Sequence, residues 1–371
     1  MLLQLSVWRT LVQARRIGVA LAVCGGGLLV GMTPALGQEP QGASVQIRGA
    51  GASFPSLVYG RWASRYSSER RGAQVSYQAT GSGDGVKQAR ARSVSFAGTD
   101  VPLSPQQLAE AKLVQIPMLV GGLVPVVNLP GVASNDLLLD GAVLADLMLA
   151  RITRWDDPRI ARLNPRLRLP ALPVTRVVRS DASGSTEMFM RYLSATSADF
   201  RAALPVSQLP AWPGKPLAAK GNDGVVAAVR ELAGAIGAVS HDRVERDRLK
   251  AVRLIGGDGK PVAASLHAFR QAILGSDLYQ QGDDLASLIN RPRAEAWPIT
   301  ATSFVLLDAA PADLRAAQAT ARFVFWCFMH GDELTRDTGF SPLPGRVQAR
   351  LAGRLFQIKG PQGELIDLGQ P

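Results

Sequence analysis

Hydrophobic and polar residues follow two different periods in the region after residue 44. Val45 and Ile47 alternate with polar neighbours, which is the pattern of a short strand. Val58, Trp62 and Tyr66 then recur at intervals of four, which marks one face of a helix. A run of small residues separates the two patterns. This stretch therefore predicts a strand, a glycine-containing loop and a helix.

The same unit continues along the first half of the chain. Residues 75–77 alternate again, the glycine-rich run 80–85 interrupts them, and residues 86–92 have helical composition. A third strand begins at Val94 and ends near Asp100. The order strand, loop, helix, strand is typical of an α/β domain with a largely parallel sheet.

Two further segments support this interpretation. Residues 104–107, Ser-Pro-Gln-Gln, combine a capping residue, a proline at the first helical position and a glutamine at the third, which predicts a helix start. In the second half a β-branched strand, Val174–Val178, is followed by the loop 179–185 and a helical segment, 186–193. The strand–loop–helix unit therefore occurs in both halves of the chain.

The loops of these units have the properties of an anion site. In open α/β sheets ligands bind beyond the carboxyl ends of the strands, where these loops lie. Each loop leads into a helix N-terminus, whose unpaired N–H groups and positive dipole end favour negative charge. Asp100 and Arg179 come at the ends of two of the strands. Three such loops with one arginine and one aspartate indicate a site for an oxyanion.

Residues 1–37 have the composition of a cleaved export signal. Arg9, Arg15 and Arg16 form a basic start without any acid, and the apolar stretch 17–32 follows it. Residues 35–37, Ala-Leu-Gly, place small residues at the positions that a signal peptidase reads. An uncleaved anchor is the alternative, but the apolar stretch is short for a membrane span and a run of three consecutive glycines, 25–27, interrupts it. We therefore expect a periplasmic protein.

Cleavage would leave a polar linker, residues 38–44, and a chain with one cysteine, Cys327. An intramolecular disulfide is then impossible, and the apolar neighbours of Cys327 predict a buried, unreactive thiol. Lipid anchoring at Cys24 is not expected, because Val23 stands where lipoprotein signals have a small residue.

Composition and charge narrow the class of protein. The chain of 371 residues is 47% hydrophobic and 19% charged, which excludes a disordered protein, a coiled coil and a polytopic membrane protein. Its length predicts about two to three domains. The formal charge of +11 includes the three arginines of residues 1–37 and falls to +8 without them. A basic chain suits an anionic partner, but the basic residues form no tract of the kind that binds nucleic acid.

Four segments carry a resemblance to a known family: 49–55 (GAGASFP), 77–83 (YQATGSG), 96–100 (FAGTD) and 179–186 (RSDASGST). They look like the corresponding segments of the phosphate-binding proteins of bacterial phosphate ABC importers. Shorter matches follow in the family's order, at residues 155–157, 163–165, 220–224, 234–237, 296–300 and 342–344. The resemblance extends from about residue 45 to the C-terminal region.

This resemblance implies a type II periplasmic-binding-protein fold, an α/β architecture of two lobes with mixed, mostly parallel sheets. The chain would cross between the lobes on two hinge strands, near 121–127 and 297–304. Lobe I would contain residues 45–122 and 299–371, and lobe II would contain residues 123–298. Neither periodicity nor composition alone predicts the discontinuous lobe.

The resemblance also implies which residues bind phosphate. Hydroxyl groups, backbone N–H groups, one guanidinium and one carboxylate would surround the ligand. These ligand residues would be Ser53, Phe54, Ser82, Asp100, Arg179, Ser183, Gly184 and Ser185. Asp181 would pair with Arg179 and fix its orientation. No catalytic residue, metal or cofactor is expected.

Asp100 is the most informative of these positions. A carboxylate facing an anion is repulsive unless the ligand donates a proton to it. Phosphate at neutral pH carries such a proton, whereas sulfate does not. A site built to accept a ligand hydrogen can reject an analogue that lacks it by roughly 10⁴–10⁵-fold. Our hypothesis is that Asp100 excludes sulfate in this way.

Three residues depart from the family pattern. Ser53 stands where many relatives have threonine. Ser185 replaces another threonine and is followed by Thr186, so the hydroxyl of either Ser185 or Thr186 could face the ligand. Asp84 adds a negative charge in the second loop. We interpret Asp84 as the cap of a helix that begins near Gly85. The alternative is that it faces the ligand, where it would weaken binding of a dianion.

The sequence as a whole predicts an exported, monomeric receptor that delivers phosphate to the permease subunits of an ABC importer. The alternatives are a secreted phosphatase with Ser183 as nucleophile, a surface protein on the same scaffold, and a receptor for another tetrahedral oxyanion. Against the phosphatase, the histidines His241, His267 and His330 lie outside the matching loops, so no base is near a candidate serine.

Overall fold

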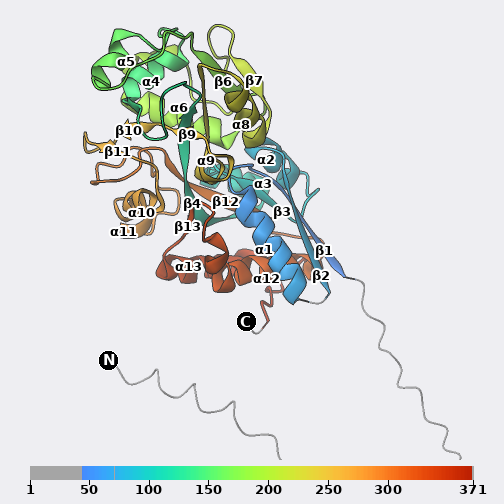
Figure 1. The fold of residues 1–371 in the computed structure, drawn as a ribbon. Coiled ribbons are helices and arrows are strands. Elements are labelled where there is room, and N and C mark those ends of the chain that lie inside the picture. The colour runs from blue at the N-terminus through green and yellow to red at the C-terminus, as the bar shows by residue number, and fades with distance from the viewer. Residues whose placement is uncertain (1–43, 71, 370–371) are drawn as a thin grey trace, which may run out of the picture. The chain divides into compact units, whose positions relative to one another are not determined.

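The computed structural model describes residues 44–70 and 72–369 (Figure 1). The strands are β1 Val45–Gly51, β2 Ala73–Ala79, β3 Phe96–Thr99, β4 Leu113–Val127, β5 Leu138–Leu139, β6 Thr175–Arg179, β7 Leu217–Ala219, β8 Ala235–Ser240, β9 Lys250–Ala251, β10 Arg253–Ile255, β11 Pro261–Val262, β12 Thr300–Asp308 and β13 Phe340–Pro342.

Helices connect most of these strands. They are α1 Ser56–Glu69, α2 Ser82–Arg90, α3 Pro105–Ala111, α4 Gly141–Met148, α5 Pro158–Leu163, α6 Gly184–Thr196, α7 Ala198–Ala203, α8 Gly221–Glu231, α9 His241–Asp247, α10 Leu266–Leu274, α11 Asp277–Gln280, α12 Leu314–His330 and α13 Gly345–Ala352, with 3₁₀ turns η1 Asp332–Thr335 and η2 Gly353–Gln357.

The first strand–loop–helix units form as the hydrophobic pattern predicts. β1 pairs in parallel with β2 on one side and with β3 on the other. The predicted capping box at α3 is present, because Ser104 and Gln107 exchange hydrogen bonds between side chain and backbone. Two helices begin earlier than their composition indicated: α2 starts at Ser82 and α6 at Gly184. The glycines and serines counted as loop therefore belong to first helical turns.

The centre of the fold is the long strand β4, whose 15 residues are all buried. Its first part, residues 113–122, pairs antiparallel with β12, and residues 123–127 pair antiparallel with β8. The sheet order is β2-β1-β3-β12-β4-β8-β6-β7. The pairs at its two ends are parallel, and the pairs through β12, β4 and β8 are antiparallel. The sheet is therefore mixed, as expected.

Two large hydrophobic clusters and a small one lie along this sheet. One large cluster comes from residues 123–299. The second comes mainly from residues 47–120 and 301–366, with Met188 and several residues of 273–288. Helices α4, α5 and α6 lie toward one end of β4, and α12 and α13 lie toward the other (Figure 1). The segments 121–127 and 297–304, predicted as strand-like crossings, fall within or next to β4 and β12. The exact lobe boundaries stay a prediction.

The remaining expectations concern termini, cysteine and charge. Residues 1–43, including the predicted signal peptide and Cys24, lie outside the described residues. Cys327 is buried and free, and burial raises the pKa of its thiol well above the usual range.

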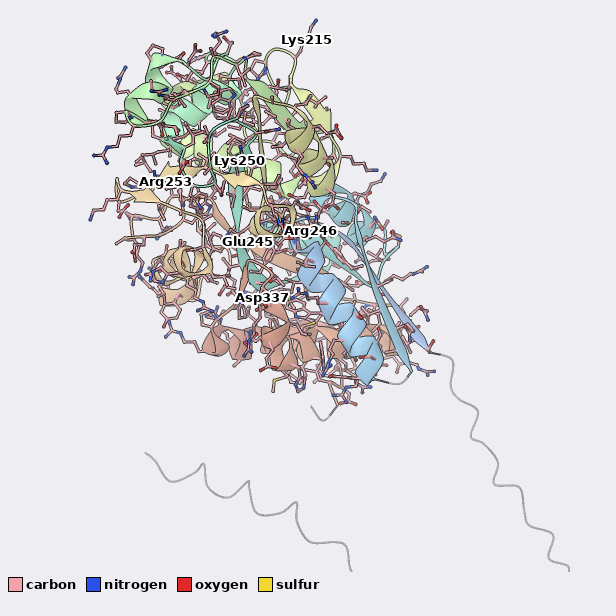
Figure 2. All side chains as sticks on the ribbon, in the orientation of Figure 1. Lys215, Glu245, Arg246, Lys250, Arg253 and Asp337 are labelled. Atoms are coloured by element: carbon pink, nitrogen blue, oxygen red, sulfur yellow. The ribbon has the colours of Figure 1, made fainter. Side chains whose placement is uncertain are left out.

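No helix within residues 44–369 has the length and apolar character needed to cross a membrane. Charged side chains are spread over the surface: Lys215 projects before β7, whereas Lys250 and Arg253 lie on β9 and β10 (Figure 2).

Candidate anion-binding site

Asp100 lies directly after β3 and is the centre of a buried polar cluster. Its side chain is inside the protein, with 4% of the residue exposed. The Ser303 hydroxyl donates to Oδ1 of Asp100 at 2.9 Å, and the Ser82 hydroxyl lies 3.4 Å from Oδ2. The backbone N–H of Asp100 donates in turn to the Ser82 hydroxyl at 3.2 Å. The end of β3, the start of α2 and the middle of β12 therefore converge on one carboxylate.

Burial raises the pKa of Asp100 to about 7, from an ordinary value of 3.8, because the ionised carboxylate is removed from water. The hydrogen bond from Ser303, the charge of Arg179 and the hydrogen bond from Ser82 oppose this effect. The carboxyl group thus changes its protonation near neutral pH. A group with this property can either accept or retain a proton when an anion approaches.

The N-terminus of α6 packs directly against this cluster. Ser183 caps the helix, since its hydroxyl accepts from the backbone N–H of Thr186 at 3.2 Å. At Gly184, an added Cβ would clash with the Ser82 hydroxyl and would lie 2.9 Å from Cβ of Asp100. Only glycine therefore lets the first turn of this 13-residue helix approach the carboxylate so closely. The positive end of the helix dipole faces the cluster.

Ser185 and Thr186, the pair of neighbouring hydroxyls in this turn, are both buried. The Ser185 hydroxyl has no hydrogen-bond partner among the described residues. A buried hydroxyl without a partner carries a cost of roughly 1–3 kcal/mol, which a ligand oxygen would remove. Ser185 is therefore a candidate donor to a ligand.

Arg179 ends β6 and is held by Asp181. Its Nε donates to Oδ1 of Asp181 at 2.7 Å, and its Nη2 donates to Oδ2. The backbone N–H of Gly221 donates to the same Oδ1 at 3.0 Å. Burial of Asp181 raises its pKa, but the contacts with Arg179 and Gly221 outweigh burial, so the net pKa lies below the usual value. The guanidinium is buried and fixed in direction by this ion pair.

Ser53 and Phe54 lie between β1 and α1. The Ser53 hydroxyl accepts a hydrogen bond from Nδ2 of Asn222 at 3.1 Å. Phe54 is fully buried, and its ring packs against the Phe340 ring in a T-shaped arrangement with centroids 4.9 Å apart. This packing fixes the backbone N–H of Phe54 at the start of α1. The hydroxyl of Tyr77 also donates to the carbonyl of Ala52 at 2.8 Å and holds the same loop.

The structure thus brings part of the predicted set into direct contact. Ser82, Asp100 and Gly184 touch one another, and the charge of Arg179 lowers the pKa of Asp100. Ser53 is connected to the second half of the chain through Asn222. The ligand roles of all eight residues stay predictions.

Two residues that contact predicted ligands were missed by the sequence. Ser303 lies in the apolar strand β12, where a single serine gives no signal. Asn222 belongs to a segment, 220–224, that matched the family without an assigned role. Behind Ser303 the Tyr59 hydroxyl lies 3.4 Å from its Oγ, and burial raises the pKa of that tyrosine.

The interpretation of Asp84 as a helix cap is wrong. Helix α2 begins at Ser82, and no side chain caps its N-terminus. Asp84 instead lies inside the first turn, where Oδ2 accepts from Nε2 of Gln88 at 2.5 Å. An acid in a first turn is stabilised by the helix dipole without being a cap.

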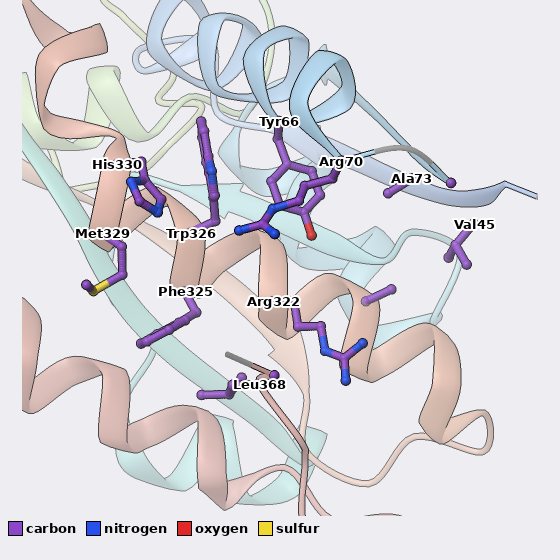
Figure 3. Close-up of a pocket in the computed structure, with 13 residues that line it drawn as sticks. Val45, Tyr66, Arg70, Ala73, Arg322, Phe325, Trp326, Met329, His330 and Leu368 are labelled. Carbon is purple, nitrogen blue, oxygen red and sulfur yellow. The ribbon is translucent and has the colours of Figure 1, made fainter. Parts of the chain in front are cut away.

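A separate surface pocket of about 360 Å³ lies between the end of α1, α12 and the C-terminal residues (Figure 3). Tyr66, Trp326 and Phe325 give it aromatic walls, and Arg70 and Arg322 lie at its edge. None of the predicted phosphate ligands lines it.

Solved structures share this architecture. The phosphate-binding protein from Stenotrophomonas maltophilia aligns with a TM-score of 0.63 and 20% identity, over 84% of this chain and 94% of that one. A putative phosphate ABC transporter substrate-binding protein with bound phosphate from Clostridium perfringens aligns with a TM-score of 0.58 and 14% identity, over 81% of this chain and 100% of that one. The fold is that of the type II periplasmic binding proteins, as predicted.

Sequence comparisons define the family. The model of the PBP superfamily domain matches residues 37–328. Phosphate-binding protein PstS of Xylella fastidiosa (strain Temecula1) is 36% identical over 304 residues, covering 82% of this chain and 83% of the relative. PstS of Haemophilus influenzae is 35% identical over 313 residues, covering 84% and 93%. The chain belongs to the PBP superfamily and, within it, to the family of the PstS phosphate-binding proteins.

Proposed function

We propose that this protein binds inorganic phosphate in the periplasm and delivers it to the permease of a phosphate ABC importer. The observation that carries this proposal is the buried carboxylate of Asp100, in contact with Ser82 and Gly184 at the first turns of two helices. Membership of the PstS family supports the same ligand. The residues proposed to bind phosphate are Ser53, Phe54, Ser82, Asp100, Arg179, Ser183, Gly184 and Ser185.

The donors in this set suit a tetrahedral anion. The first turn of α6 offers the N–H groups of Gly184 and Ser185, which have no partner within a helix. The hydroxyl of Ser183 accepts from Thr186, so its own proton is available for a ligand oxygen. Arg179 contributes a planar fork that can contact two oxygens at once, and Asp181 keeps it in place.

Asp100 would supply the one acceptor. In the proposed complex its carboxylate accepts a hydrogen bond from the P–OH group of HPO₄²⁻ or H₂PO₄⁻, while the hydroxyls of Ser303 and Ser82 donate to the same carboxylate. An unprotonated sulfate would leave this buried carboxylate facing a second negative charge without a hydrogen bond, which costs more than the roughly 1–3 kcal/mol of a neutral group. Discrimination against sulfate follows from this difference.

Delivery requires that the two halves of the fold separate. We propose that they correspond to lobe I, residues 45–122 and 299–371, and lobe II, residues 123–298, with bending in β4 and β12. Phosphate that bridges Asp100 and the first turn of α6 would favour the closed form, because the ligand contacts both lobes only in that form. The permease would then distinguish loaded from unloaded protein by the lobe arrangement.

Export, cleavage after residue 37 and a monomeric state belong to the same proposal. The relatives named above are binding proteins, and the proposed mechanism contains no bond-breaking step. Mass spectrometry of the exported protein tests cleavage and lipidation together. Light scattering tests the monomeric state.

Isothermal titration of the protein, first stripped of carried-over anion by partial unfolding and dialysis, tests the ligand. Phosphate should bind tightly, with a stoichiometry of one, and sulfate should not compete. Arsenate and molybdate in parallel titrations distinguish a phosphate receptor from one for other oxyanions. Absence of phosphate binding by refolded protein, or turnover of an aryl phosphate that Ser183→Ala abolishes, would contradict the proposal.

A further inference from the structure

The first turn of α8 contacts the proposed phosphate site from two directions. The backbone N–H of Gly221 donates to Asp181, which orients Arg179. The next residue, Asn222, donates to the Ser53 hydroxyl in the loop before α1. Two neighbouring residues of one helical turn are thus connected to proposed ligands that come from opposite halves of the sheet.

Asn222 is fixed on both sides. Its residue is 2% exposed, and its Oδ1 accepts the backbone N–H of Ser240, the last residue of β8, at 3.1 Å. Because a backbone N–H can only donate, this contact determines the orientation of the amide. The amide nitrogen must then point toward Ser53, and it can only donate.

This orientation determines what the Ser53 hydroxyl can do. A hydroxyl has one proton and two lone pairs, and at Ser53 one lone pair accepts the Asn222 N–H. The hydroxyl proton therefore stays available for another acceptor. A phosphate anion offers mostly acceptor oxygens, so it needs hydroxyls whose protons are directed toward it.

We propose that Asn222 is a positioning residue for phosphate binding: it directs the proton of Ser53 toward the ligand and joins the two halves of the site. This inference rests on the proposed function. Asn222 does not touch phosphate itself but acts through Ser53. It also connects β8 to the loop before α1, which contributes to the closed arrangement.

The neighbouring Asp223 provides a matched control in the same helical turn. It forms ion pairs with Arg243 and Arg246 and its side chain is 75% exposed. Arg243 keeps a second partner, Asp242, when Asp223 is changed. The pair with Arg246 is exposed and contributes little, and the buried Arg243 keeps Asp242, so Asp223→Asn should leave phosphate affinity unchanged.

The test is a double-mutant cycle of Asn222→Ala and Ser53→Ala, with phosphate affinity measured by isothermal titration. Asn222→Ala alone should weaken binding by about tenfold, the loss of one well-oriented hydrogen bond to an anion. In the Ser53→Ala background the same substitution should have almost no further effect, because the residue through which it acts is gone. Equal losses in both backgrounds would show a merely structural role and overturn the proposal.

Asn222→Ala leaves the N–H of Ser240 without a partner and could therefore disturb folding. A second variant controls for this effect. Asn222→Asp keeps the acceptor for that N–H but cannot donate to Ser53 when ionised, and it attracts the serine proton away from the ligand. It should fold and bind phosphate at least tenfold more weakly than wild type. Wild-type affinity in a folded Asn222→Asp protein overturns the inference. Failure of the wild-type protein to bind phosphate would instead overturn the proposed function.

Discussion

The hydroxyl of Ser303 donates to Oδ1 of Asp100 at 2.9 Å, although the two residues are 203 positions apart in the chain. Antiparallel pairing of β12 with β3 brings them together, since Phe304 lies opposite Thr99 in the register. The strand that carries Ser303 also pairs with β4, which continues into the second half of the fold. The carboxylate is therefore held from the centre of the sheet and approached by α6 from the other half.

The first prediction concerns selectivity between anions. Asp100→Asn replaces the buried acceptor by a neutral amide that can donate. We expect phosphate affinity to fall and sulfate affinity to rise, so that discrimination between the two decreases by several orders of magnitude. Competition titrations of both anions against the variant measure it. Discrimination equal to that of the wild type would mean that another group excludes sulfate.

The second prediction is a pH dependence of stability without ligand. Burial raises the pKa of Asp100 to about 7 in the folded protein, against 3.8 in an unfolded chain. The folded state therefore binds a proton that the unfolded state releases. The stabilising contribution is complete at a pH below the unfolded value and is lost as the pH rises through about 7.

Between pH 5 and pH 8 the free energy of unfolding should consequently decrease by an amount on the order of 2–4 kcal/mol from this residue. Urea unfolding in phosphate-free buffer across that range measures it. Asp100→Asn should remove this part of the pH dependence, and an unchanged slope in the variant would show that another group causes it.

The third prediction tests the contact between Ser303 and Asp100. Ser303→Ala removes a hydrogen bond that favours the ionised carboxylate, so the pKa of Asp100 should rise further. The pH at which stability is lost should then move upward. The same substitution in an Asp100→Asn background should leave the pH profile unchanged, and a shift there would argue for an effect unrelated to the carboxylate.

The sequence predicted the local units of the fold well because short periods determine them. Three confirmed features depend only on neighbours within a few residues: the strand at Val45, the helix face at Trp62 and the capping box at Ser104. The starts of α2 and α6 were placed too late. Glycine and serine have low helix propensity, yet at Ser82 and Gly184 close packing outweighs it.

The contacts across the site could not be predicted in the same way. Nothing in the composition of β12 distinguishes Ser303 from a serine in any other buried strand, because its role depends on the register with β3. Asn222 is similar, since its partner Ser53 is 169 residues away. The Arg179–Asp181 pair was foreseen because both residues lie within one short loop.

The fourth prediction concerns that pair. Asp181→Asn removes the charge that holds Arg179, and the guanidinium should lose its fixed direction. We expect phosphate to bind about 10–100-fold more weakly, the range for a charged hydrogen bond, while the fold is retained. Arg154 and Asp156 form a pair of the same spacing on the exposed surface, with two hydrogen bonds of 3.0 and 3.1 Å. Asp156→Asn is therefore the matched control and should leave affinity unchanged; equal effects of both substitutions would contradict an orienting role.

The last prediction uses the close approach of α6. Gly184→Ala adds a methyl group that clashes with the Ser82 hydroxyl and lies 2.9 Å from Cβ of Asp100. The two elements must move apart, so phosphate affinity should fall by at least tenfold, whereas α6 alone would gain from alanine. Gly60→Ala in the middle of α1 is the control, because its new methyl group meets no atom within 4 Å. That control should raise the free energy of unfolding by about 0.5–1 kcal/mol and leave affinity unchanged. Titration calorimetry and urea unfolding of both variants measure these effects, and undiminished affinity in Gly184→Ala would show that phosphate does not bind where α6 meets Asp100.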